Sequence, residues 1–168
     1  MRPAQNDYPA FANDYVSLVK GNTVAEIITI HNDELLHFVE SIPDTKANYS
    51  YAENKWSVKE VIQHLIDTER IFSYRALALA RGEKQSLPGF QQNDYATNSF
   101  ANMRAFSDLK EEYITLRISS NILFRSFNHA VLKNRGLINS YETTCLGMIY
   151  MTFGHALHHK NLLLQKYL

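Results

Sequence analysis

The chain has 168 residues, a length that suits one domain with a single hydrophobic core. Seventeen basic residues balance seventeen acidic ones, so the sequence lacks the positive field expected of a nucleic-acid-binding protein. It also lacks the roughly 18 uninterrupted apolar residues of a membrane helix and the apolar core of a signal peptide. We therefore expect a single domain over residues 1–168, in the cytoplasm, without nucleic-acid or membrane partners.

Helix signals dominate the first half of the chain. A short N-terminal helix is predicted from Pro9 to about Val19. Two capping-box patterns follow, Thr23-Val-Ala-Glu26 and Ser57-Val-Lys-Glu60, in which a hydroxyl caps the helix and a glutamate reaches back. Apolar residues recur at helical spacing after each pattern, which predicts helices from Thr23 to about Ser41 and from Ser57 to Gly82.

The second half of the chain begins with a long predicted loop from Gly82 to Ser99, whose aromatic residues favour an ordered, functional segment. A third long helix is expected from about Ser99 or Asn102 to Val131, then a turn through residues 134–136, and a last helix from about Thr144 to Leu168. No alternating apolar pattern is long enough to predict a sheet. The predicted fold is all-α, a four-helix bundle with a short extra N-terminal helix.

Three histidines in the last predicted helix are the strongest chemical signal. His155 and His159 are four positions apart, so their side chains leave one helix face, about 40° apart around the axis and about 6 Å along it. Two imidazoles at this spacing can form half of a zinc or nickel site. His158 points elsewhere. Ala156 stands where metalloproteases of the H-E-x-x-H type carry their glutamate base, so that class is excluded.

A third metal ligand has to come from another helix. The candidates are His31, His37, His64 and His129. His64 is the best of them, because it lies at the border of an apolar helix face with Glu60 and Asp67 about one turn away on either side. Either carboxylate could accept the spare N–H of His64 and fix its tautomer. The alternative is a histidine with a purely structural role.

Both faces of the last predicted helix look buried. The face with His155 and His159 lies roughly opposite an apolar face that includes Phe153 and Leu157. If the histidines point into the bundle, the N-terminal helix or a second subunit has to cover the other face, and we expect a homodimer. If the histidines instead face solvent, no metal site exists.

Two segments of the sequence resemble the DinB-like (YfiT-like) superfamily of metal-dependent proteins. They are Trp56-Ser-Val-Lys-Glu-Val-Ile-Gln-His64 and Gly154-His155-Ala-Leu-His158-His159, and Leu87-Pro88-Gly89-Phe90 extends the resemblance. It implies a four-helix bundle, often dimeric, in which His64, His155 and His159 bind nickel or zinc. Many relatives carry an aspartate after the L-P-G-F segment, whereas this chain has Gln91, which leaves the substrate open.

The resemblance implies a metal-dependent enzyme with a small-molecule substrate, either a thiol S-transferase or isomerase that uses a low-molecular-weight thiol, or a hydrolase. Three imidazoles leave open positions on an ion, where water or a thiol can lose its proton. No residue is assigned as a general base. The alternative is a non-catalytic metal-binding, structural or stress-response protein. A di-iron site is disfavoured, because Glu34-Leu-Leu-His37 supplies one of the two motifs it needs and no second copy occurs.

Overall fold

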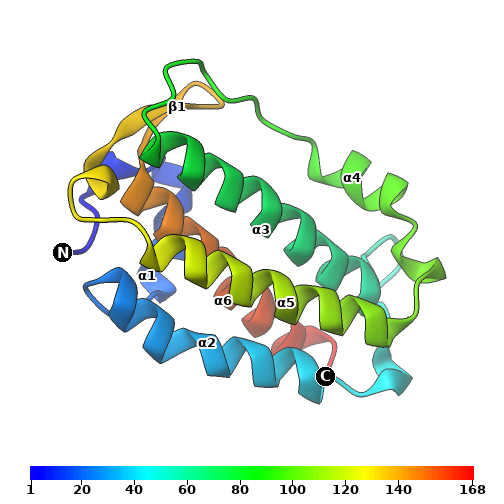
Figure 1. The fold of residues 1–168 in the computed structure, drawn as a ribbon. Helices are drawn as coiled ribbons and strands as arrows, with labels where there is room; N and C mark the ends of the chain where they lie inside the picture. Colours follow the sequence, from blue (N-terminus) through cyan, green and yellow to red (C-terminus); the bar gives the residue numbers. More distant parts are fainter.

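A computed structural model describes residues 1–168 and shows four long helices packed as a bundle (Figure 1). These are α2 (Val24–Ser41), α3 (Val58–Ala80), α5 (Phe106–Arg125) and α6 (Cys145–Lys166). The short helix α1 (Asn13–Leu18) packs against α6. The structure therefore confirms the all-α four-helix bundle with a short extra N-terminal helix.

The helix starts follow the capping patterns of the sequence. At α3 the capping box is complete, since the Ser57 hydroxyl accepts from the Glu60 N–H and the Glu60 carboxylate accepts from the Ser57 N–H at 2.7 Å. At α2 the Thr23 hydroxyl accepts from the Glu26 N–H, but the Glu26 carboxylate accepts from the N–H of Asn22 rather than that of Thr23. Both helices begin where the sequence predicts.

The segments between the long helices contain more structure than the sequence predicts. The loop after α3 includes a short helix, α4 (Gln92–Ser99), and α5 begins later and ends earlier than expected. The expected turn before α6 is an antiparallel hairpin of β1 (Arg135–Ile138) and β2 (Tyr141–Thr144). Five 3₁₀ turns complete the chain, at Gln5–Asp7, Ala10–Ala12, Asp44–Lys46, Ala101–Met103 and Val131–Lys133.

The N-terminal segment covers the outer face of α6. Two glycines of α6 permit this close packing. A Cβ atom at Gly147 would lie 2.1 Å from the carbonyl oxygen of Asp7, and one at Gly154 would lie 2.2 Å from that of Tyr15. The sequence analysis left two candidates to bury this face, the N-terminal helix and a second subunit. The N-terminal segment buries it, so no second subunit is needed there.

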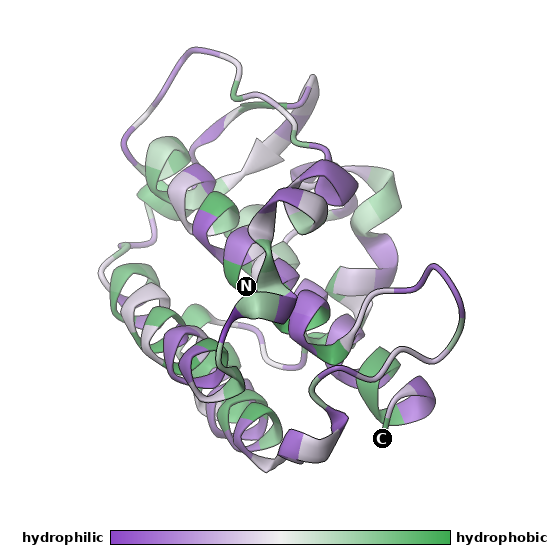
Figure 2. Cartoon of the chain, turned by 90° about the vertical axis from the view of Figure 1, so that its right-hand side faces the viewer, coloured by the Kyte–Doolittle hydropathy of each residue, from purple (hydrophilic) through white to green (hydrophobic).

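The hydrophobic core lies between the four long helices. Hydrophilic residues interrupt the hydrophobic ones along these helices (Figure 2), and none of them combines the length and the apolar character that crossing a membrane requires. Both the apolar face of α6 and the face with His155 and His159 are buried, so these two histidines lie inside the molecule.

Candidate metal centre

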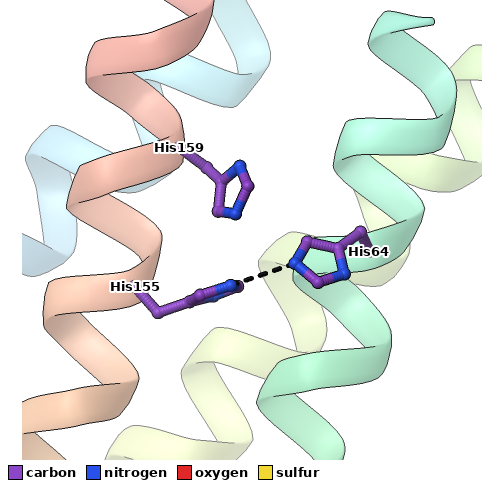
Figure 3. A group of neighbouring side chains, drawn as sticks. All are labelled: His64, His155 and His159. Carbon is purple, nitrogen blue, oxygen red and sulfur yellow. Dashed lines mark hydrogen bonds between the residues drawn. The ribbon is translucent and has the colours of Figure 1, made fainter. Parts of the chain in front are cut away.

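Three histidines from two helices converge inside the bundle. His64 comes from α3, and His155 and His159 come from α6 (Figure 3). The Nε2 atoms of His64 and His155 are 3.0 Å apart, and the His159 ring centroid lies 4.9 Å from that of His64 and 4.5 Å from that of His155. One nitrogen from each ring falls within 4.8 Å of the others. The sequence-predicted ligand set is therefore brought together in space.

The start of α3 and the end of α6 hold these rings in register. The Trp56 ring, next to the cap of α3, packs 4.9 Å from the His64 ring. The Tyr167 hydroxyl, at the end of α6, donates to the Trp56 carbonyl oxygen at 3.0 Å. Because His155 and His159 are one helical turn apart, both then face His64.

Burial keeps all three imidazoles neutral. The side chains belong to residues that are only 5% to 8% exposed. Burial lowers the pKa of His64 to about 4. It also lowers the pKa of His159 to about 3, with a smaller contribution from the neighbouring histidines, and the pKa of His155 falls well below its ordinary value for the same reasons. At neutral pH each ring has a free nitrogen lone pair, the form that binds metals.

The hydrogen bonds inside the cluster leave nitrogen atoms without partners. His159 makes no hydrogen bond, and its Nδ1 atom is fully buried. The only other polar contact of His64 is from its Nδ1 to the Thr68 hydroxyl, at 3.4 Å. A buried polar atom without a partner costs about 1–3 kcal/mol. Three neutral imidazoles that face one another fit the nitrogen ligands of zinc and related divalent ions.

The two carboxylates expected to orient His64 have other partners. Glu60 is held in the capping box, and Asp67 accepts a hydrogen bond from the Gln63 side chain at 2.9 Å. Neither accepts from His64, contrary to the prediction. Thr68, one turn after His64, is the side chain within reach of its Nδ1.

The remaining histidines are not part of the cluster, although the His158 ring lies beside it, with its centroid 5.2 Å from that of His159. His31 is buried, and its Nε2 accepts from the Lys20 N–H at 2.9 Å, which is a structural role. His37, His129 and His158 are exposed. The arrangement in which the histidines of α6 face solvent therefore applies to His158 alone.

A cavity of about 310 Å³ opens at His64 and His155. His159 does not line it. The predicted loop contributes to the cavity wall through Phe90 and Gln91, whereas Tyr95 packs on Phe90 with ring centroids 5.1 Å apart. Gln91, the position where many relatives have aspartate, thus faces the cavity.

Several wall residues were not identified from the sequence. They come from the N-terminal segment, from α3 and from the hairpin: Phe11, Tyr15, Phe72, Arg75, Asn139, Tyr141 and Thr143. Tyr15 lies edge-on to the His155 ring at 5.7 Å. Gly154, just before His155, was the one sequence signal for this wall, since a glycine permits another backbone to approach the helix there.

Comparison with known proteins gives consistent results. The sequence model of the DinB superfamily matches residues 27–163. A protein from Oceanobacillus iheyensis, provisionally named a metal-dependent hydrolase, is 25% identical over 113 residues. The match covers 62% of this chain and 65% of the relative, so it spans slightly less than two thirds of that protein's length.

Two solved structures share the fold. YfiT from Bacillus subtilis, described as a probable metal-dependent hydrolase with an unusual four-helix bundle topology, superposes with a TM-score of 0.71 at 15% identity, over 98% of this chain and 90% of that one. The mycothiol-dependent maleylpyruvate isomerase superposes with a TM-score of 0.66 at 10% identity, over 92% of this chain and 60% of that one. At these identities the likeness concerns the fold alone. The family match spans most of the sequence, and the chain belongs to the DinB superfamily.

Proposed function

We propose that the chain is a metal-dependent enzyme in which His64, His155 and His159 hold one divalent cation, nickel or zinc, beside the substrate cavity. The observation that supports it is the meeting of three buried, neutral imidazoles where a cavity of about 310 Å³ ends. Ligand nitrogens within 4.8 Å of one another need only small ring movements to face a common point. A closed structural site would almost always have four protein ligands, so three ligands beside a cavity favour catalysis.

The ion and the chain have separate tasks in this proposal. A divalent cation held by three imidazoles supplies Lewis acidity and lowers the pKa of a water or thiol that reaches it. Thr68 orients His64 through its Nδ1. Phe72 and Tyr15 pack against the His155 ring, with ring centroids 5.8 and 5.7 Å away, and hold it at the cavity wall. The cavity then positions the substrate next to His64 and His155.

The reaction we propose is hydrolysis, or transfer of a low-molecular-weight thiol, on a small electrophilic molecule. The names of the two kinds of relatives, a metal-dependent hydrolase and a mycothiol-dependent isomerase, support these two classes. The size of the cavity is at the lower end for ligand pockets and suits a small molecule.

The proposal also covers the setting of the enzyme. We take residues 1–168 as one metal-binding unit that acts in the cytoplasm, where the buried, unpaired Cys145 would stay reduced. A homodimer remains a prediction. The face of α6 that suggested a second subunit is already covered by the N-terminal segment. Light scattering at micromolar concentration measures this directly.

Metal content of tag-free protein tests the proposal. We expect about one divalent ion per chain in the wild type and loss of most of it in His64→Ala, His155→Ala and His159→Ala. His158→Ala is the matched control, since His158 is exposed on the same helix and should leave the metal content unchanged. Circular dichroism verifies that each variant folds. Equal metal content in the control and the three ligand variants would exclude the site.

Activity separates an enzyme from a non-catalytic metal protein. The wild type with its metal should hydrolyse an activated ester or conjugate glutathione to an aryl halide, and a chelator should abolish the reaction. Metal binding without turnover of any substrate in such a panel would support the non-catalytic alternative instead.

A further inference from the structure

Arg75 is a buried arginine in the cavity wall without an acidic partner. Its residue is only 7% exposed, yet it forms no ion pair with any carboxylate. Its one hydrogen bond is from Nη2 to the Pro88 carbonyl oxygen, at 2.6 Å. A guanidinium has five N–H donors, so most of its donor capacity is unused. Buried charges are normally paired, because an isolated one is costly.

The charges around the cavity leave Arg75 unbalanced. Among the residues that line the cavity, Arg75 is the only arginine or lysine, and no aspartate or glutamate is present. Burial lowers the pKa of Arg75 from its usual value, but a guanidinium stays protonated at physiological pH. The cavity is therefore positive before any metal ion is added.

Aromatic rings hold the guanidinium in place. Its central carbon lies 5.7 Å from the ring centroid of Phe72 and 5.7 Å from that of Phe90. Such contacts fix the plane of the guanidinium, which is the geometry that recognises a carboxylate through two parallel hydrogen bonds. The contact with Pro88 also ties the loop after α3 to this side chain.

Arg75 and the histidine cluster share one face of α3. Arg75 is eleven positions after His64, which is about three helical turns, so both side chains point in nearly the same direction. Phe72 bridges the remaining gap, since its ring lies 5.8 Å from the His155 ring and also contacts Arg75. A small molecule in the cavity can thus touch Arg75 with one end and reach the imidazoles with the other.

The rest of the wall suits an apolar body. Phe11 and Tyr141 form an edge-to-face pair with centroids 5.5 Å apart, both line the cavity, and both are substantially exposed. Met148 and Met151 add further apolar surface from α6. A ligand with one anionic group and an apolar remainder would match these contacts.

We infer that the substrate of this cavity carries a carboxylate, which Arg75 binds while an apolar or aromatic body packs between Phe72, Phe90 and Tyr141. The inference deepens the proposed function and rests on it only in taking this cavity as the substrate site. Arg75 is a specificity residue in this arrangement, and the reacting bond lies at the opposite end, near His64 and His155.

Matched pairs of acids and amides test the inference. The probes are benzoate with benzamide, phenylacetate with phenylacetamide, and succinate with succinamide, titrated into the zinc-loaded protein by calorimetry or NMR. We expect at least one acid to bind about tenfold more tightly than its amide, and Arg75→Gln to remove that preference by weakening acid binding far more than amide binding. Arg75→Lys should keep part of the preference, since it keeps the charge but loses the bidentate geometry. If no acid binds better than its amide, the inference is overturned.

Two further arms separate Arg75 from the metal ion and from general charge effects. Arg125→Gln removes the same charge from an exposed position outside the cavity and should behave as wild type. The metal-free wild type should keep the Arg75-dependent preference for the acid, because no ion is then present to bind a carboxylate. If Arg75→Gln binds the acid as tightly as wild type, the inference fails while the metal proposal stands. If the chain binds no metal but the Arg75-dependent preference persists, the metal proposal fails and the carboxylate site stands.

Discussion

The Nε2 atoms of His64 and His155 face each other at 3.0 Å, although the two residues are 91 positions apart in the chain. A neutral imidazole offers one N–H and one lone pair, so this contact can be satisfied by a proton from only one of the rings. His159 then remains without a partner, with its Nδ1 buried. A single cation can accept a lone pair from all three rings, which a hydrogen bond between two of them cannot do.

Acid should destabilise the metal-free protein. The pKa of His64 is about 4 and that of His159 about 3 in the folded chain, against 6.5 for an unperturbed histidine. Because the folded state binds fewer protons than the unfolded state, the free energy of unfolding should fall as pH drops below about 6.5, by up to about 1.4 kcal/mol per pH unit for each histidine. Urea denaturation at several pH values between 7 and 5 measures this slope. The slope should be smaller in His159→Ala but not in His158→Ala, and equal slopes in all three proteins would contradict the prediction.

Thr68→Val should weaken metal binding without unfolding the protein. The substitution keeps the shape of the side chain and removes the hydroxyl that contacts the Nδ1 atom of His64 at 3.4 Å. Loss of such an orienting group typically costs about tenfold or more in metal affinity. Competition with a chromophoric chelator gives the affinity. Thr152→Val is the control, since its hydroxyl is equally buried but donates to the Met148 carbonyl oxygen. Identical zinc affinities in Thr68→Val and Thr152→Val would show that Thr68 does not support metal binding.

The long helices and the histidine spacing could be predicted because their signals are local. Caps, apolar periodicity and the four-residue interval between His155 and His159 all operate within one helix. The helix pattern favoured His64 as the third ligand without excluding the other histidines, and the family resemblance then selected it. The structure places His64 beside the α6 pair, and metal binding by the three residues stays a prediction.

The parts that could not be predicted depend on contacts between distant segments or on short elements. Each hairpin strand has only four residues, and its turn needs positive φ angles at Asn139 and Ser140, neither of which is glycine. Thr68 rather than Glu60 contacts His64, because side chains on a helix lean towards its N-terminus and Glu60 is already used in the cap. The cavity wall combines the N-terminal segment, α3, the loop after α3, the hairpin and α6, which no local pattern reveals.

The buried residues Glu69 and Arg117 should be energetically coupled, so that loss of one of them costs more stability than loss of both. Their side chains lie 2.5 Å apart, both are almost completely buried, and the guanidinium also stacks on Phe153 at 4.7 Å. Arg117→Met should lower the free energy of unfolding by about 3–5 kcal/mol, because it leaves the Glu69 carboxylate buried without a partner. The double variant Glu69→Met with Arg117→Met should recover most of that loss. Urea denaturation measures both, with Arg125→Met as an exposed control. A double variant as unstable as the sum of its single variants would show that the pair is not coupled.

Gly154→Ala should loosen the N-terminal segment while leaving the metal ligands in place. The new Cβ atom would lie 2.2 Å from the Tyr15 carbonyl oxygen, so the segment has to move away from α6. We expect a loss of about 1–3 kcal/mol in the free energy of unfolding, typical of overpacking, and faster proteolysis within residues 1–22. Zinc content should stay near the wild-type value, because His64, His155 and His159 are carried by α3 and α6. Gln165→Ala, an exposed change on the same helix, should show neither effect. Wild-type stability in Gly154→Ala would mean that the segment does not pack against α6 in solution, and the cavity would then lose the wall that Phe11 and Tyr15 provide.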